Sequence, residues 1–311
     1  MKQFQNKIAE SRLALPAASL YALAVWLLCG LLTQHWWVQF GCFAVATYLM
    51  VELNNINALI RIYSRMVSCT FVALSCCACF LFPSLLGAIM QICVIGTFML
   101  LFATYQDKAS VGMTYYAFTV LGICSMTFVH VVYYLPLLWI LMATHLQSLS
   151  WRTWGASILG LLTPYWFASC WLIWHEDFSL LADHFTQLAE FQFPIRHLSL
   201  SPSQIAFFAL LLLLFVVSSV HNIRQQNLDK IRIRLLYGVL IWTGLLTVVF
   251  ILFQPQHYNS LIRIMIICTA PLAAHFIALT HTKLTNIFFC AITAITLLLT
   301  IYNVWMSSSL F

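Results

Sequence analysis

The sequence predicts an all-α protein, a polytopic transmembrane helix bundle of about 11 spans. Two observations carry this prediction: hydrophobic residues make up 63% of the 311 positions, and charged residues make up only 7%. Soluble domains carry about 25% charged residues, and a soluble fold of this size could not hide so much apolar surface. We therefore expect residues 1–311 to form a single integral membrane domain.

The lengths of the apolar runs distinguish helices from strands. Runs such as 205–220, 235–253 and 287–305 are continuous, and about 20 residues is the length that a helix needs to cross a hydrocarbon core. Strands of a membrane barrel would instead alternate apolar and polar residues. Because unpaired backbone amides are costly in lipid, the uninterrupted runs predict spanning helices.

Eleven apolar segments are separated by polar connectors. The segment 112–145 fits either two short helices or one long helix, and a single helix would place the basic stretch 224–234 outside the cell. Two helices are therefore favoured. The expected spans are 14–33, 36–53, 66–83, 85–104, 112–127, 129–145, 154–174, 203–221, 235–253, 262–280 and 286–306.

The distribution of positive charge predicts the orientation. With the N-terminus inside, 12 of the 14 Lys and Arg residues fall on the cytoplasmic side, and only Arg196 and Arg263 fall outside. This asymmetry is the one that the positive-inside rule describes, and it places the C-terminus outside. The charge is thus explained by topology, which gives no reason to expect a nucleic-acid partner. A bacterial inner (cytoplasmic) membrane is the expected location.

Two polar segments interrupt the apolar pattern. In Asn54–Arg65, Arg61 and Arg65 stand four residues apart, which predicts an interfacial helix with its cations toward lipid head groups. The second segment, 175–203, is the only sizeable outer loop.

The outer loop is expected to contain a short amphipathic helix, because its apolar residues recur at helical spacing. Ser201 to Gln204 then matches a capping box with Pro202 at the first helical position, which predicts the start of the eighth span. The apolar stripe consists of Phe178, Leu181, Phe185 and Leu188.

The same loop holds the most reactive-looking side chains. Glu176, Asp183 and His184 are candidates for sharing a proton or holding a cation, and Arg196 is a candidate for binding a phosphate. The simpler alternative is a solvated polar loop on an interfacial helix. Their spacing matches no metal motif, and the eleven cysteines lie in apolar segments, where we expect small buried hydrophobes. No metal or cofactor is predicted.

Two further candidates for substrate binding lie within predicted spans. Arg263, near the outer end of the tenth span, either faces a cavity or partner, or snorkels to the interface, which is the more frequent outcome. His275 lies in the middle of the same span and has no histidine at a clearly matching depth for haem ligation. We expect it to be a neutral histidine that is hydrogen-bonded within the bundle.

Several short motifs resemble an uncharacterised multi-pass inner-membrane family of Bacteroidota. The resemblance covers most of the chain and implies an inner-membrane location and topology, but it implies no activity. The motifs are Val51–Asn57, Ala117–Phe118 with Leu121–Gly122, Leu149–Arg152 with Ala156–Tyr165, Lys230–Arg234 and Pro271–Ala274.

Three functions remain open. A non-enzymatic envelope scaffold, partner or transport component is favoured, because the chain lacks a phosphate-binding loop, a nucleophile elbow and a His-Glu-x-x-His helix. A glycosyltransferase or polymerase acting on lipid-linked sugars would use the acids and arginines of the outer loop, but the first outer connector, 33–37, has no acidic residue. A small-molecule or lipid transporter would use Arg263 and His275. The expected partners are membrane lipids, other envelope proteins or lipid-linked glycans.

Overall fold

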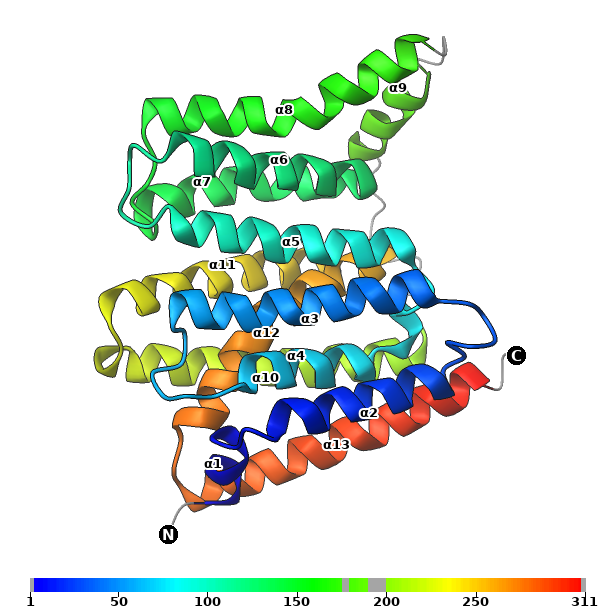
Figure 1. Ribbon diagram of the computed structural model, residues 1–311, viewed down its shortest axis with the longest axis vertical. Helices are drawn as coiled ribbons and strands as arrows, with labels where there is room; N and C mark the ends of the chain where they lie inside the picture. Colours follow the sequence, from blue (N-terminus) through cyan, green and yellow to red (C-terminus); the bar gives the residue numbers. More distant parts are fainter. Residues whose placement is uncertain (1–2, 175–178, 190–199, 309–311) are drawn as a thin grey trace.

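The computed structural model describes residues 3–174, 179–189 and 200–308, and within these ranges the chain is helical and contains no strand. Figure 1 shows the longer helices side by side with their connectors at two opposite ends. The prediction of an all-α fold is confirmed. Predictions that concern 175–178 and 190–199 lie outside the described residues.

Each of the eleven predicted segments coincides with a helix. Two short helices, α1 (Phe4–Ala9) and α9 (Ser179–Thr186), are added to them. The eleven are α2 (Ala14–Leu28), α3 (Trp37–Asn57), α4 (Met66–Cys77), α5 (Leu85–Ala103), α6 (Val111–Thr127), α7 (Leu135–Thr144), α8 (Trp151–Trp174), α10 (Pro202–Gln225), α11 (Ile231–Phe253), α12 (Tyr258–Leu279) and α13 (Lys283–Ser308). Single turns of 3-10 helix occur at Cys79–Leu81 (η1), Gln187–Ala189 (η3), Gln226–Leu228 (η4) and Pro255–His257 (η5), and a longer one at Val129–Tyr134 (η2).

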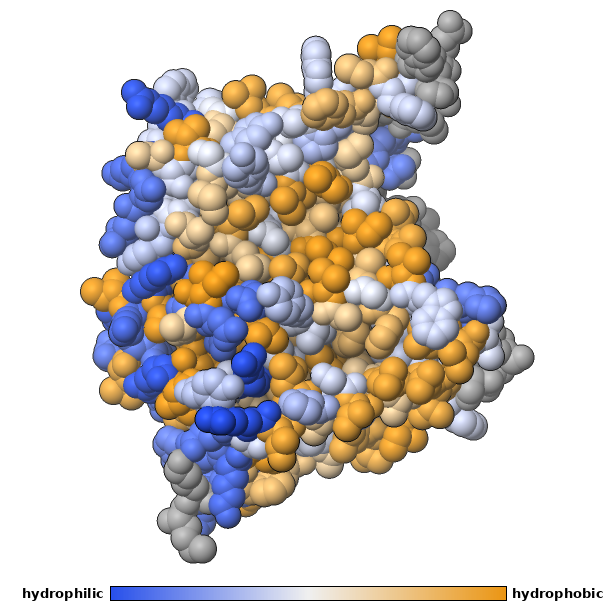
Figure 2. Space-filling view, in the orientation of Figure 1, coloured by the Kyte–Doolittle hydropathy of each residue, from blue (hydrophilic) through white to orange (hydrophobic). Residues whose placement is uncertain are grey.

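Six helices of the described chain are long and apolar enough to cross a membrane. Four further apolar helices are shorter, with 10–17 residues. Figure 2 shows hydrophobic residues over the middle of the visible face, while hydrophilic residues gather mainly at the end that holds the N-terminus. This is the surface pattern of a membrane-embedded bundle. The six segments are Leu85–Ala103, Trp151–Ile173, Pro202–Leu228, Ile231–Phe253, Pro255–Leu279 and Lys283–Met306.

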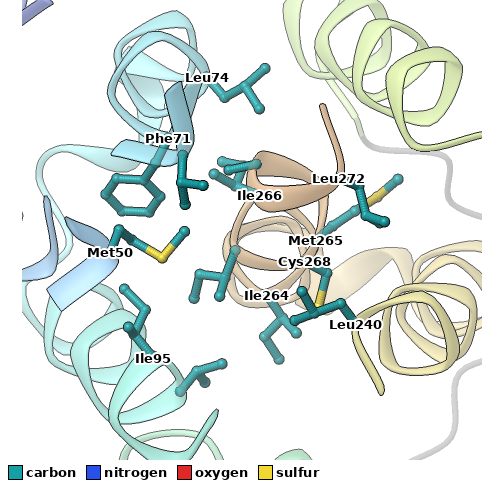
Figure 3. Packing of buried hydrophobic residues seen from close by; sticks show 14 of the residues in the cluster. Met50, Phe71, Leu74, Ile95, Leu240, Ile264, Met265, Ile266, Cys268 and Leu272 are labelled. Carbon is teal, nitrogen blue, oxygen red and sulfur yellow. The ribbon is translucent and has the colours of Figure 1, made fainter. Parts of the chain in front are cut away.

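Helix α12 forms the centre of the bundle. Every residue from Leu261 to Thr280 is buried, and α12 packs against α1, α4, α5, α10 and α11. Figure 3 shows apolar side chains of α12, such as Met265 and Cys268, among Met50 and Leu240 of neighbouring helices. Polar side chains on α12 from Leu261 onward therefore face other helices rather than lipid.

The first helix closes one end of α12. The side-chain amide of Gln5 donates to the hydroxyl of Thr280 at 2.8 Å, and the amide of Asn6 donates to the carbonyl of Thr280 at 2.9 Å. The last carbonyls of an α-helix have no partner within the helix. Two side chains of α1 thus satisfy polar groups at the C-terminal end of the central helix.

Helices α6 and α8 approach closely because glycines face the contact. A Cβ at Gly122 would lie 2.7 Å from the carbonyl oxygen of Leu161, and a Cβ at Gly160 would lie 2.4 Å from that of Tyr115. Small residues at such contacts let the backbones of membrane helices meet. The pair packs as one layer at the edge of the bundle (Figure 1).

The segment 112–145 forms two helices, as predicted. Extended backbone at Phe128, with φ −150° and ψ 92°, separates α6 from η2 and α7. In the predicted outer loop, α9 matches the predicted short helix. The predicted capping box is also present: the hydroxyl of Ser201 accepts from the backbone N–H of Gln204, whose side chain accepts from the backbone N–H of Ser201.

The predicted interfacial helix over Asn54–Arg65 is wrong. Helix α3 continues to Asn57 and ends at Ala58, which has a left-handed backbone conformation (φ 49°), and 58–65 contain no helix. The amide of Asn54 donates to the carbonyl of Ser64 at 3.2 Å, so the connector folds back onto α3. The asparagines bind local backbone in place of forming a new helix.

Candidate functional site

Helix α12 carries two buried polar centres. The Asp229 centre consists of Arg61, His221, Asp229, Tyr237 and His275, and the Arg263 centre consists of Gln91 and Arg263. Arg263 and His275 are about 18 Å apart along the helix axis, from the rise per residue of an α-helix. The central helix therefore places ionisable groups at two levels of the bundle.

A carboxylate forms the middle of the Asp229 centre. Asp229 follows η4 in the connector between α10 and α11, and its side chain is only 2% exposed. Its Oδ2 lies 2.9 Å from Nε2 of His275, and its Oδ1 lies 3.5 Å from Nε of Arg61. A buried carboxylate is costly unless it is paired and hydrogen-bonded. His275 and Arg61 supply that pairing.

Arg61 links this centre to the surface. Its side chain is 35% exposed, and its guanidinium also donates to the carbonyl of Leu228 at 3.0 Å. His275, in contrast, is fully buried on α12. Arg61 thus connects the contact between Asp229 and His275 to the exposed end of the bundle.

Aromatic rings surround His275. The ring of Tyr237 meets it edge-on at 4.9 Å, and the ring of His221 lies 5.9 Å away. Two buried polar atoms at this centre have no hydrogen-bond partner among the described residues: Nδ1 of His275 and Nε2 of His221. Unpaired buried groups cost about 1–3 kcal/mol each. The centre thus contains more hydrogen-bonding atoms than its own packing satisfies.

Sequence reasoning identified only His275 of this centre. It was expected to be hydrogen-bonded within the bundle, and it is. Arg61 and Asp229 were missed as site residues. One signal pointed to Asp229: it is the acidic residue in a connector that otherwise carries Arg224, Lys230 and Arg232. An isolated carboxylate among cations at a helix end is a candidate for a buried ion pair.

The guanidinium of Arg263 faces the interior and does not snorkel to the interface. It donates through Nη1 to Oε1 of Gln91 at 2.9 Å and through Nη2 to the carbonyl of Leu81. Gly87 of α5 leaves room for it, since a Cβ there would lie 2.7 Å from Nε of Arg263. Snorkelling, which is the more frequent outcome for an arginine near a helix end, does not occur for Arg263 because other helices enclose α12 at this position.

The outer-loop candidates lie apart from both centres. Nε2 of His184 is 3.3 Å from the hydroxyl of Tyr165, which is 2.8 Å from Oγ of Ser125. Asp183 is exposed on α9. Helix α9 lies beside α8, away from the central helix (Figure 1). Glu176 and Arg196 lie outside the described residues. Asp183, His184, Arg263 and His275 thus do not form one site.

The cysteines lie mostly in the core. All eleven are free thiols, and eight of them are buried. Within the described ranges no group of three or more His, Cys, Asp or Glu residues could hold a metal ion.

Comparisons with protein-family models, curated proteins and solved structures find no match to this chain. The resemblance to a Bacteroidota membrane family therefore stays a prediction.

Proposed function

We propose that this chain is a multi-pass protein of a bacterial inner membrane and transports a small solute along α12. In this proposal all eleven apolar helices span, the N-terminus is inside, and the C-terminus is outside. The connectors at the end of the bundle that holds the N-terminus support the orientation (Figure 1), because they carry Arg61, Lys108 and Lys230.

One observation carries the transport role: a helix that is buried from Leu261 to Leu279 bears ionisable side chains at two levels. Ionisable groups within a membrane are costly, and they commonly mark substrate or proton pathways. A scaffold would need neither Arg263 nor the pair of Asp229 and His275 in its interior. A glycosyltransferase would need the acids of the outer loop beside Arg263, and Asp183 instead lies on α9.

The Asp229 centre has the geometry of a proton-binding element. His275 and Asp229 can share one proton across their 2.9 Å contact, and Arg61 stabilises the carboxylate when the proton leaves. A change of charge there alters the electrostatics next to the central helix. Proton binding at this end would thus couple to solute movement along α12.

Reporter fusions test the topology. A fusion within 225–230 is expected to report the cytoplasm, and a fusion after residue 308 is expected to report the outside. A reporter at 225–230 that is active outside the cell would overturn the orientation.

A flux assay tests transport. Proteoliposomes with a trapped pH-sensitive dye would be exposed to gradients of amino acids, sugars, monocarboxylates or inorganic anions. We expect at least one class to change the internal pH with the wild type. The change should be lost with Asp229→Asn and kept with Asp107→Asn, which alters an exposed carboxylate in the connector between α5 and α6. Folded wild-type protein that moves none of these solutes would contradict the proposal.

A further inference from the structure

A small, partly open cavity lies beside Arg263, between α2, α3, α4, α5 and α12. It has a volume of about 20 Å³. We infer that this cavity binds one inorganic anion of halide size, such as chloride. The inference names a ligand for the Arg263 centre of the proposed function, but binding itself does not require transport. Residues that line the cavity include Trp26, Gln39, Ser75, Phe82, Gln91 and Arg263.

The charge of the cavity favours an anion. Arg263 is 5% exposed, and none of the carboxylates in the described ranges lies within ion-pair distance of it. Its hydrogen bonds go to neutral oxygens of Gln91 and Leu81. An unbalanced cation in a low-dielectric interior interacts strongly with a nearby anion, because little solvent screens the pair.

The remaining polar atoms of the cavity suit an acceptor ligand. Trp26 and Ser75 both line the cavity, and the indole nitrogen of Trp26 and the hydroxyl of Ser75 are buried without a partner among the residues that the structure describes. The indole N–H can only donate, and the hydroxyl can donate one hydrogen bond. A single anion between these groups and Arg263 would accept from all three.

The size of the cavity selects the kind of anion. A cavity needs about 10–15 Å³ of space for the centre of a water-sized sphere to hold one such species. This cavity offers about 20 Å³. One monatomic ion fits this space, whereas a complete phosphate or an organic acid does not. The ring of Phe82, stacked on Trp26 at 3.8 Å between centroids, forms a rigid wall.

Stability measurements on the purified full-length protein in a neutral detergent test binding. Sodium chloride and sodium bromide would be compared with sodium gluconate at equal ionic strength, since a ligand that binds the folded state raises the unfolding midpoint. We expect chloride and bromide to raise the midpoint and gluconate to leave it unchanged. Equal effects of all three salts would overturn the inference and would leave a bound water as the occupant.

Substitutions locate the effect. Ser75→Ala should weaken halide binding about tenfold, the cost of losing one hydrogen bond to a charged ligand. Ser68→Ala, on the same helix but bonded to the carbonyl of Arg65, should leave binding unchanged. Gly87→Ala displaces Arg263 and should abolish the halide effect, whereas Gly96→Ala, whose Cβ would be 3.6 Å from its nearest neighbour, should not. A halide effect that survives both Ser75→Ala and Gly87→Ala would contradict this site.

Two further arms separate the possible sources and the two proposals. If a lipid phosphate oxygen occupied the cavity, anionic lipid in nanodiscs would raise the unfolding midpoint and halide would add no further rise. That outcome overturns the inference. Halide binding without solute flux would support the inference and contradict transport. Flux of another solute, without any halide effect, would support transport and contradict the inference of a halide site.

Discussion

Gly160 of α8 lies directly against the backbone of Tyr115 in α6, where a Cβ would approach the carbonyl oxygen to 2.4 Å. Gly160→Ala is therefore expected to push the two helices apart and to destabilise the protein by about 1–3 kcal/mol. Gly155→Ala, on the same helix with no atom within 4 Å of its Cβ, should be neutral or slightly stabilising. Unfolding midpoints in detergent would measure both. Equal effects would argue against the close contact.

Removing the carboxylate of Asp229 should destabilise the end of the bundle that holds the N-terminus. Asp229→Ala leaves buried His275 without its partner, at a cost of about 1–3 kcal/mol. Asp229→Asn keeps an acceptor and should cost less, and Asp107→Ala should change stability by less than about 0.5 kcal/mol. Thermal unfolding of the three variants checks this order, and an equal effect of Asp107→Ala would refute it.

The contact between α1 and α12 should contribute measurably to stability. Asn6→Ala removes a buried donor from the carbonyl of Thr280, and we expect a loss of about 1–3 kcal/mol. Lys7→Ala changes an exposed residue of the same short helix, so it serves as the control. Denaturant titration would detect the difference. A folded protein insensitive to both substitutions would show that α1 is dispensable.

The thiols should differ in reactivity according to their burial. Cys170 and Cys290 are exposed, whereas Cys124 and Cys268 are buried. Because a thiol must be accessible and ionised to react, a membrane-permeant maleimide should first label Cys170, which lies near the end of α8, and should label the eight buried thiols only after denaturation. Mass spectrometry of labelled peptides follows this order. Rapid labelling of Cys268 in the native protein would contradict the enclosure of α12.

The helices could be predicted from the sequence because each is a local property. An apolar run such as 235–253 specifies a helix in lipid wherever it lies in the bundle. The capping box at Ser201 and the break at Phe128 are likewise set by neighbouring residues. Uncertainty affected mainly the ends: α11 begins at Ile231 and α12 at Tyr258, earlier than expected, because polar residues extend these helices beyond their apolar runs.

The site could not be predicted in the same way, because it depends on which helix lies in the centre. Periodicity does not distinguish an enclosed helix from a lipid-facing one when both are apolar. Arg263 is buried because α12 lies in the centre of the bundle. The same position of α12 lets His275 pair with Asp229, which lies 46 residues away in the chain. The interfacial helix expected at Asn54–Arg65 failed because Asn54 binds the backbone at Ser64.

The enclosure of α12 has a consequence for biosynthesis. The neighbours of this helix, α4, α5, α10 and α11, all precede it in the chain. Because synthesis proceeds from the N-terminus, those helices cannot complete their packing until residues 258–279 have left the ribosome. A nascent chain that stops before Tyr258 would thus lack the central helix of the bundle. Quality-control proteases should recognise the surfaces of the other helices that α12 normally covers.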